Sequence, residues 1–343
     1  NCTWVDFFTD WDDGLARLVA WLRGAEPPES TRSTHTDPFR PYVEALYKQI
    51  VADLKFSVFS DDVIPLRSQS APDAVPTPTL TTRFVTYSVA EPKPQREVAR
   101  DFDSFPAAWH AYDGRVLLLG EPGAGKTTTL LAFARDAAAA RLNDPTQPLP
   151  ILARIAGWDS LNETPLSEWL STEIESLVGT PFMASAASIA NLIAQGKTLL
   201  LLDGLDELGA ERPLDPTNPQ EGTYDPRARF LPLIPVTGQV LLTSREVEYN
   251  QIGLQARLKG AVVLKPLDDA QMQAYLTGMD DLWAVLASDN ALREAIRTPL
   301  LLALFRVAFA ELPEEARQLR DLSGGDLNDR IWSLFIERRW KHE

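Results

Sequence analysis

Five short apolar runs alternate with helical patterns between residues 115 and 268, and this alternation restricts the possible folds more than any other feature. Each run is almost continuously hydrophobic, as are strands of a parallel sheet that are buried on both faces. We therefore expect an α/β fold with a five-stranded, mainly parallel sheet and helices on both faces. The helical patterns cover residues 126–142, 166–177 and 185–193. The apolar runs are VLLLG at Val116, ILARI at Ile151, TLLLLD at Thr198, VLLTS at Val240 and AVVLK at Ala261.

The remaining residues divide into segments before and after this α/β domain, which we expect at 111–268. Residues 1–24 are expected to be the tail of an upstream domain, whose effector-like character is implied only by the resemblance described below. Residues 25–110 are expected to be a linker followed by a helical and irregular segment, with a helix at 42–54 and an edge strand at 83–89. A small all-helical domain is expected at 269–343, with helices over 269–276, 282–286, 292–312 and 327–340.

A proline-rich insert from Glu211 to Pro235 interrupts the α/β pattern. Clusters of proline and polar residues between periodic segments are typical of loops. We therefore expect this insert to be an exposed loop.

The charge balance and the single cysteine exclude several classes of protein. There are 33 Lys and Arg residues against 48 Asp and Glu residues, so the formal net charge is −15. This excess of negative charge argues against direct binding to nucleic acid or to an anionic membrane surface, since both are themselves negatively charged. Cys2 is the only cysteine, so no internal disulfide can form. With no signal peptide and no apolar run of ~20 residues, we expect a cytoplasmic chain, and the start at Asn1 predicts a fragment of a larger protein.

The segment GEPGAGKTT follows the first apolar run and precedes a helical pattern, and it fits the P-loop pattern G-x-x-x-x-G-K-[ST]. Its glycines can turn main-chain N–H groups toward phosphates, and the following helix adds the positive end of its dipole. Lys126 can reach the β- and γ-phosphates, and Thr127 can offer its hydroxyl to Mg²⁺. The alternative, a glycine-rich turn that binds nothing, is disfavoured by this context. The expected nucleotide-binding residues here are Gly120, Glu121, Pro122, Gly123, Ala124, Gly125, Lys126, Thr127 and Thr128.

A second motif, LLLLDGLDE, ends the third apolar run with Asp203. At the carboxyl edge of the sheet this carboxylate would lie beside the P-loop and hold Mg²⁺ through water, with Thr127 as the other metal-binding side chain. Asp206 and Glu207 follow just beyond the strand, and either could orient or deprotonate an attacking water. The alternative is a plain acidic loop at a sheet edge. The stretch of chain between the two motifs has room for one more strand, ILARI. This favours assignment to the branch of P-loop proteins in which an extra strand separates the two motifs.

Two further positions are candidates on weaker grounds. Arg245 follows the fourth apolar run, where it could sense a γ-phosphate or could equally be a solvated or ion-paired arginine. Pro299 lies in the sequence Thr298-Pro299-Leu300, which is good chemistry for starting a helix and is on that ground alone a weak candidate for a ligand contact.

The stretches GEPGAGKTT, LLLLDGLDEL, LLTSR, KPLDDAQMQAYL and RTPLLLALF together make residues 116 to about 340 resemble a NACHT domain, of the STAND class of signalling P-loop NTPases found in bacterial NLR-like proteins. The resemblance implies ATP or ADP with Mg²⁺ as ligands, Arg245 as the sensor of the γ-phosphate, and Pro299 against the nucleotide base. It also implies a winged-helix domain and a sensor repeat array beyond the end of this chain. The first residues, WVDF…GLARLVAWLRG, are similar to the last strand and helix of TIR-like effector domains.

The resemblance implies a signalling switch within a larger immune (antiphage) or regulatory protein. Exchange of ADP for ATP would permit self-assembly, and slow ATP hydrolysis would reset the resting state. The expected partners are the nucleotide, further copies of the chain, and the effector and sensor domains of the parent protein, with no membrane partner. A P-loop enzyme with multiple turnover (a kinase or motor ATPase) and a scaffold with an inactive site are the alternatives. The residues leave open whether Asp206 or Glu207 activates water, and only the resemblance favours adenine over guanine.

Overall fold

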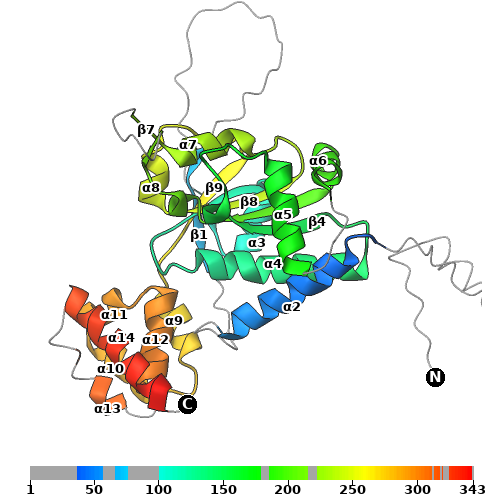
Figure 1. Ribbon diagram of the computed structural model, residues 1–343. Coiled ribbons are helices and arrows are strands. Elements are labelled where there is room, and N and C mark those ends of the chain that lie inside the picture. The colour runs from blue at the N-terminus through cyan, green and yellow to red at the C-terminus, as the bar shows by residue number, and fades with distance from the viewer. Residues whose placement is uncertain are drawn as a thin grey trace, which may run out of the picture.

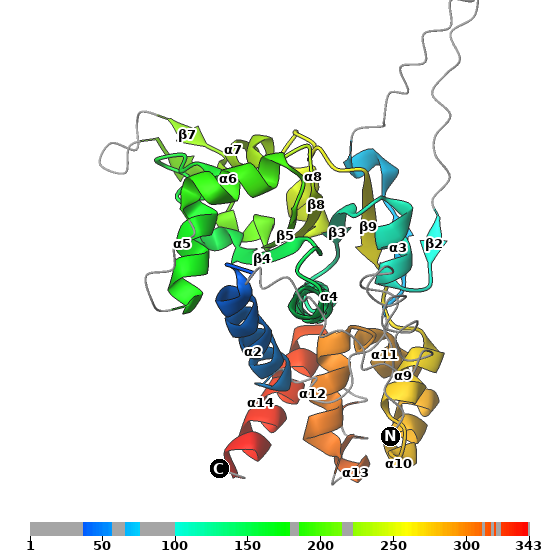
Figure 2. The ribbon, with the colours of Figure 1, turned by 90° about the vertical axis from the view of Figure 1, so that its right-hand side faces the viewer.

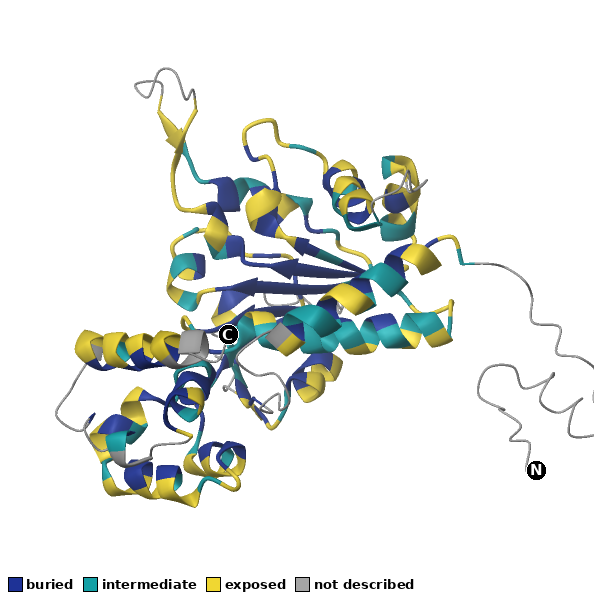
Figure 3. Cartoon of the chain, turned by 60° about the horizontal axis from the view of Figure 1, so that its bottom comes forward, coloured by how far each residue is buried: buried dark blue, intermediate teal, exposed yellow. Residues whose placement is uncertain are grey.

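All five apolar runs form strands of one seven-stranded sheet in the computed structural model, which describes residues 37–56, 66–75, 100–178, 185–214, 222–310, 313–316, 319 and 324–341. These strands are parallel to one another and lie in the order β9-β3-β8-β5-β4. Almost all of their side chains are buried, and Figure 3 shows the strands in dark blue between helices. The predicted α/β fold is confirmed. The five strands are β3 (Arg115–Leu119), β4 (Leu149–Arg154), β5 (Thr198–Asp203), β8 (Gln239–Ser244) and β9 (Gly260–Leu264).

An extra strand does separate the P-loop strand from the strand that ends in Asp203. It is β8, which lies between β3 and β5, whereas the run ILARI belongs to the edge strand β4. Because the five strands are parallel, their carboxyl ends meet at one edge of the sheet. The P-loop, Asp203 and Arg245 all stand at this edge, since each ends or follows one of the central strands.

Two short antiparallel strands extend the sheet beyond the five that the sequence predicts. β1 (Ser68–Ser70) pairs with β9, and β2 (Asp101–Phe102) pairs with β1. These strands carry no apolar run, because they are held by main-chain hydrogen bonds to a neighbouring strand rather than by two apolar faces. The sheet therefore has seven strands rather than five, and two of them come from before residue 111. The strand expected at 83–89 and the segment 1–24 lie outside the described residues.

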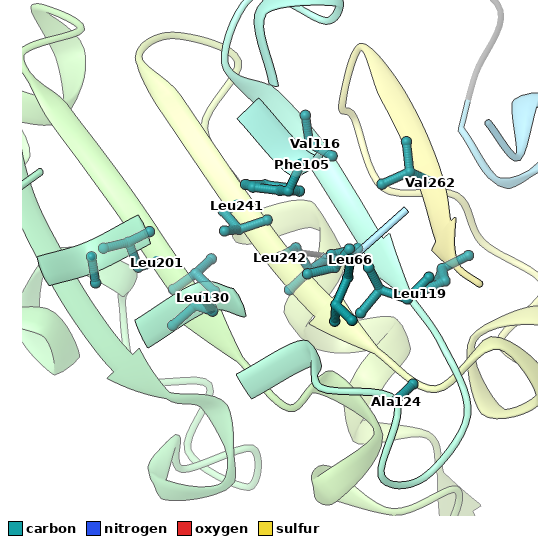
Figure 4. Packing of buried hydrophobic residues seen from close by; sticks show 14 of the residues in the cluster. Leu66, Phe105, Val116, Leu119, Ala124, Leu130, Leu201, Leu241, Leu242 and Val262 are labelled. Atoms are coloured by element: carbon teal, nitrogen blue, oxygen red, sulfur yellow. The ribbon is translucent and has the colours of Figure 1, made fainter. Parts of the chain in front are cut away.

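Helices cover both faces of the sheet. α4 (Lys126–Asn143) lies below the sheet in Figures 1 and 2, and α7 (Pro226–Phe230) lies above it. α2 (Arg40–Phe56) packs against α4 and α5 (Leu166–Val178), so the helix predicted in this region is part of the same body. Leu130 of α4 belongs to one buried cluster with leucine and valine side chains of β3, β5, β8 and β9, several of which are labelled in Figure 4. The other helices of this domain are α3 (Phe105–Ala111), α6 (Ala186–Ala194) and α8 (Glu246–Asn250).

The proline-rich insert is not simply an exposed loop. A two-stranded hairpin, β6 (Arg212–Pro213) with β7 (Thr223–Tyr224), leads into α7. The Asp225 side chain caps α7 by accepting from the main-chain N of Arg227, and Pro226 occupies the first turn, where its missing N–H costs nothing. Phe230 at the end of α7 is fully buried and packs edge-on against Trp158 and Trp169. Proline thus starts a buried helix here, so the prediction of an exposed loop is wrong for 226–230.

The described residues after 268 form a group of helices, called the helical domain below, which lies below the sheet in Figure 1. The helix expected over 292–312 is interrupted at Arg297-Thr298-Pro299, because proline cannot donate within a helix interior and Thr298 caps a new helix through Leu301 N. Within the described segments, no helix has both the length and the apolar character needed to span a bilayer. The helices are α9 (Asp269–Tyr275), α10 (Asp280–Ser288), α11 (Asn290–Ala295), α12 (Pro299–Phe309), α13 (Pro313–Ala316) and α14 (Gly324–Lys341).

Candidate nucleotide-binding site

The loop from Gly120 to Gly125 joins the carboxyl end of β3 to the first residue of α4. Gly123 and Gly125 have φ angles of 74° and 90°, which lie in the left-handed region that residues other than glycine rarely adopt. Gly125 is the N-cap of α4, and no side chain caps this helix. The first N–H groups of α4 therefore have no side-chain acceptor, and a helix start of this kind is suited to binding an anion.

Lys126 lies across this loop. Its Nζ donates to the carbonyl oxygens of Gly120 (2.7 Å) and Glu121 (3.1 Å). Burial lowers the pKa of Lys126 from its usual 10.5, while the charges of Asp206, Asp203 and Glu121 act in the opposite direction. The ammonium group is thus held at the mouth of the loop by neutral carbonyls, which an incoming phosphate can replace.

Asp203 is the last residue of β5, and its carboxylate accepts hydrogen bonds from the P-loop side and from β8. Its Oδ2 accepts from Thr127 Oγ1 at 3.0 Å, and its Oδ1 accepts from Thr243 Oγ1 at 2.6 Å. The carboxylate is buried, with 7% of the residue exposed. The structure therefore brings together the two side chains, Thr127 and Asp203, that the sequence predicts as metal ligands.

These two side chains fit a magnesium ion better than an ion that needs a full protein cage. Mg²⁺ keeps several waters and takes few protein ligands besides substrate phosphates. In the part of the chain that the structure describes, no group of three or more His, Cys, Asp or Glu side chains is arranged to hold a metal. One carboxylate and one hydroxyl, 3.0 Å apart beside a P-loop, are the oxygen donors that such an ion uses.

Asp206 and Glu207 lie on the short helical turn η3 (Leu205–Leu208), but their surroundings differ. Asp206 is clamped by Arg245: the main-chain N of Arg245 donates to Oδ1 at 3.0 Å, and its Nε lies 3.0 Å from Oδ2. The Asp206 side chain is only 9% exposed. No ion pair involves Glu207 among the described residues, and partial burial together with the charges of Asp203 and Asp206 raises its pKa above the usual 4.5.

The start of α12, from the helical domain, packs onto the P-loop. The main-chain N of Leu300 donates to Gly123 O at 3.3 Å. Pro299 is buried, and its Cγ is 3.7 Å from the place that a Cβ on Gly125 would occupy. Leu300 and the P-loop residues line a pocket of about 200 Å³, whose other members are Gly123, Gly125, Lys126, Thr127 and Thr128.

The sequence-based prediction missed three residues of this site. Leu66 lies against the P-loop, with its Cδ1 2.9 Å from a Cβ built on Gly125, and Figure 4 shows it beside Leu119. No motif marks it, because it is a single leucine far upstream. Thr243 and Leu300 stand within the stretches LLTSR and Thr298-Pro299-Leu300, in which the chosen candidates were Arg245 and Pro299, so these two stretches were the available signal. All of the predicted site residues stand at the carboxyl edge of the sheet or at the start of α12.

The sequence matches the family model of the NACHT domain over residues 114–280. This range runs from the start of β3 to the start of α10 and contains the P-loop, Asp203 and Arg245, but not Pro299. No curated protein matches the chain. The P-loop geometry, the strand order and the family match agree with one another. Residues 114–280 of this chain are therefore a NACHT domain, a nucleotide-binding module of the STAND class of P-loop NTPases.

Proposed function

We propose that this chain is an ATP- and ADP-dependent signalling switch with slow, Mg²⁺-dependent ATP hydrolysis, which controls self-assembly of a larger protein. A role of that protein in bacterial immunity is an expectation from the family resemblance. The observation that carries the proposal is the contact of α12 with the P-loop. Because Leu300 bonds to Gly123 and Pro299 packs at Gly125, the helical domain contributes part of the nucleotide pocket. A ligand that fills this pocket and touches the helical domain differently in the docked and undocked states can therefore shift the equilibrium between them.

The charged residues give this coupling a chemical basis. Arg245 is 46% exposed on its side chain and is held at the strand end by Asp206, so its guanidinium can exchange this partner for a γ-phosphate. Lys126 would exchange its carbonyl partners for phosphate oxygens. A bound Mg²⁺ would neutralise phosphate charge, and Thr127 and Asp203 would hold it. ATP brings one more phosphate than ADP, and therefore more negative charge, to Arg245 and Lys126. This difference can shift the equilibrium between the docked and undocked positions of the helical domain.

Glu207 is the better candidate for activating water in this arrangement. Both carboxylate oxygens of Asp206 accept from Arg245. Asp206 therefore serves to hold Arg245 in place, and its oxygens are not free to take a proton from water. The pKa of Glu207 is raised above 4.5, which makes its carboxylate a stronger base. We therefore assign proton abstraction to Glu207 and the positioning of Arg245 to Asp206.

The alternative of a kinase with an arginine-rich lid finds no support in the insert. Arg227 is 2% exposed, pairs with Asp225 and donates to Glu248 O. The guanidinium of Arg229 stacks 3.7 Å from the ring centroid of Tyr224 and pairs with Glu163. Both arginines already have structural partners.

The direct test measures nucleotide binding by Lys126→Ala, with Lys48→Ala as the matched control. Lys48 is exposed on α2, on a helix remote from the P-loop in sequence. Because a hydrogen bond to a charged group contributes about 1.5–3 kcal/mol, we expect K126A to bind ADP at least about tenfold more weakly in calorimetry. K48A should bind like the wild type. Light scattering after size exclusion should show larger assemblies with ATPγS than with ADP. Unchanged affinity in K126A would falsify nucleotide binding at this loop, and one assembly state with both nucleotides would contradict the switch.

A further inference from the structure

Thr243, near the end of β8, makes two hydrogen bonds that meet at the predicted metal ligand. Its Oγ1 lies 2.6 Å from Asp203 Oδ1, and the main-chain N of Gly204 donates to the same Oγ1 at 2.8 Å. Thr243 is 1% exposed, so water does not compete for these bonds. One hydroxyl on β8 thus joins the carboxylate that ends β5 to the turn that follows it.

The direction of each bond follows from the donors and acceptors available. A hydroxyl has one proton to donate and two lone pairs. The N–H of Gly204 can only donate, so the threonine oxygen accepts from it. An ionised carboxylate can only accept, so the threonine proton points to Asp203 Oδ1. Thr243 is therefore held in a single orientation, and its β-branched side chain has few other rotamers.

The other oxygen of Asp203 is the one nearer to the P-loop, although Oδ1 also lies 3.3 Å from Thr127 Oγ1. Oδ2 lies 3.0 Å from Thr127 Oγ1, on the side where the phosphates of a nucleotide would bind. Without the bond from Thr243, Thr127 would be the one described side chain still hydrogen-bonded to this carboxylate, whose terminal torsion is broad for aspartate and would be less restrained. A freely rotating carboxylate presents its oxygen to a metal ion only part of the time.

We propose that Thr243 is a positioning residue that orients Asp203 for Mg²⁺ by occupying one of its carboxylate oxygens. The bond to Gly204 extends this role to the turn that carries Asp206 and Glu207. Gly204 has a φ of 78°, and a Cβ there would lie 2.8 Å from Glu207 Cδ, so this turn requires glycine, and the bond from Gly204 N to Thr243 is one of its fixed points. The inference rests on the proposed nucleotide and magnesium binding and assigns to Thr243 a part in it that neither motif marks.

The test compares ATPγS binding with Mg²⁺ and with EDTA, measured by calorimetry. The readout is the ratio of the dissociation constant in EDTA to that in Mg²⁺, since this ratio isolates the contribution of the metal. We expect Thr243→Val and Thr243→Ala to lower the ratio at least about fivefold, while the dissociation constant in EDTA changes less than about twofold. Thr243→Ser keeps the hydroxyl and should keep most of the ratio. Ser244→Ala is the matched control, because it removes a neighbouring buried hydroxyl that, among the described residues, donates to the carbonyl of Arg245 and not to Asp203.

Unfolding curves identify variants that fold, and T243A replaces T243V if the valine variant does not. A wild-type ratio retained by the hydroxyl-free variants overturns the inference, as does equal weakening in both buffers or an equal loss in T243S. A wild type that binds ATPγS with no effect of Mg²⁺ overturns the inference while leaving nucleotide binding intact. A wild type that binds in neither buffer overturns the proposed function and the inference with it.

Discussion

Gly125 offers the most quantitative test of the P-loop, through the substitution Gly125→Ala. Its φ of 90° is unfavourable for any residue with a Cβ, by about 1–2 kcal/mol. The added Cβ would also lie 2.9 Å from Leu66 Cδ1 and 3.7 Å from Pro299 Cγ, so the leucine would have to move. We expect the free loop to relax away from the left-handed conformation. Binding would then have to restore it, which weakens ADP affinity about 5- to 30-fold.

The matched control is Gly253→Ala. Gly253 has a φ of 69°, and a Cβ there would meet nothing within 4 Å. This variant pays a similar backbone cost in its free energy of unfolding but lies outside the P-loop. Calorimetry with ADP and urea unfolding of both variants separate the two effects. The reasoning is refuted if G125A binds ADP like the wild type, or if G253A loses as much affinity as G125A.

Two further predictions concern stability. Arg115, at the opposite end of β3 from the P-loop, donates four hydrogen bonds to main-chain carbonyls. Arg115→Met leaves these acceptors without a donor and should lower the free energy of unfolding in urea by about 3–5 kcal/mol while ADP affinity stays unchanged; a loss below about 1 kcal/mol would contradict this account. Glu207→Gln should unfold at higher urea than the wild type at pH 7, because the raised pKa of Glu207 means that its charge opposes folding above that pKa. The difference should vanish as the pH falls below about 4.5, where both states are protonated, and a constant difference from pH 4 to pH 7 would show that charge is not the cause.

The central strands could be predicted because burial on two faces leaves a direct mark on the residues. β3, β5 and β8 need apolar side chains at nearly every position, and the sequence supplies them. The strands β1 and β2 leave no such mark, since a polar segment such as Ser68–Ser70 can join a sheet through its main chain alone. The helix α7 was missed for a related reason: proline at a first helical turn looks in sequence like proline in a loop.

The P-loop could be predicted because its function depends on local backbone geometry. One short motif specifies the whole loop, because its parts follow one another directly in the chain. These parts are the glycines with positive φ, Lys126 and the start of α4. Asp203 is separated from Lys126 by a long stretch of chain, but it ends a recognisable strand, and the parallel order brings the two together. The assignment between Asp206 and Glu207 needed the position of Arg245, which is set by the pairing of β5 and β8.

By itself, the sequence determined the α/β fold and the P-loop and predicted Thr127 and Asp203 as a pair, because each of these depends on which residue types follow one another along the chain. Only the tertiary structure decided that Leu66 and Leu300 close over the loop and that Thr243 bonds to Asp203. These contacts join residues that are distant in sequence and ordinary in type. Their contribution to the site depends on how close their side chains lie to the loop and to Asp203 and on how they are oriented, and only folding sets this distance and orientation.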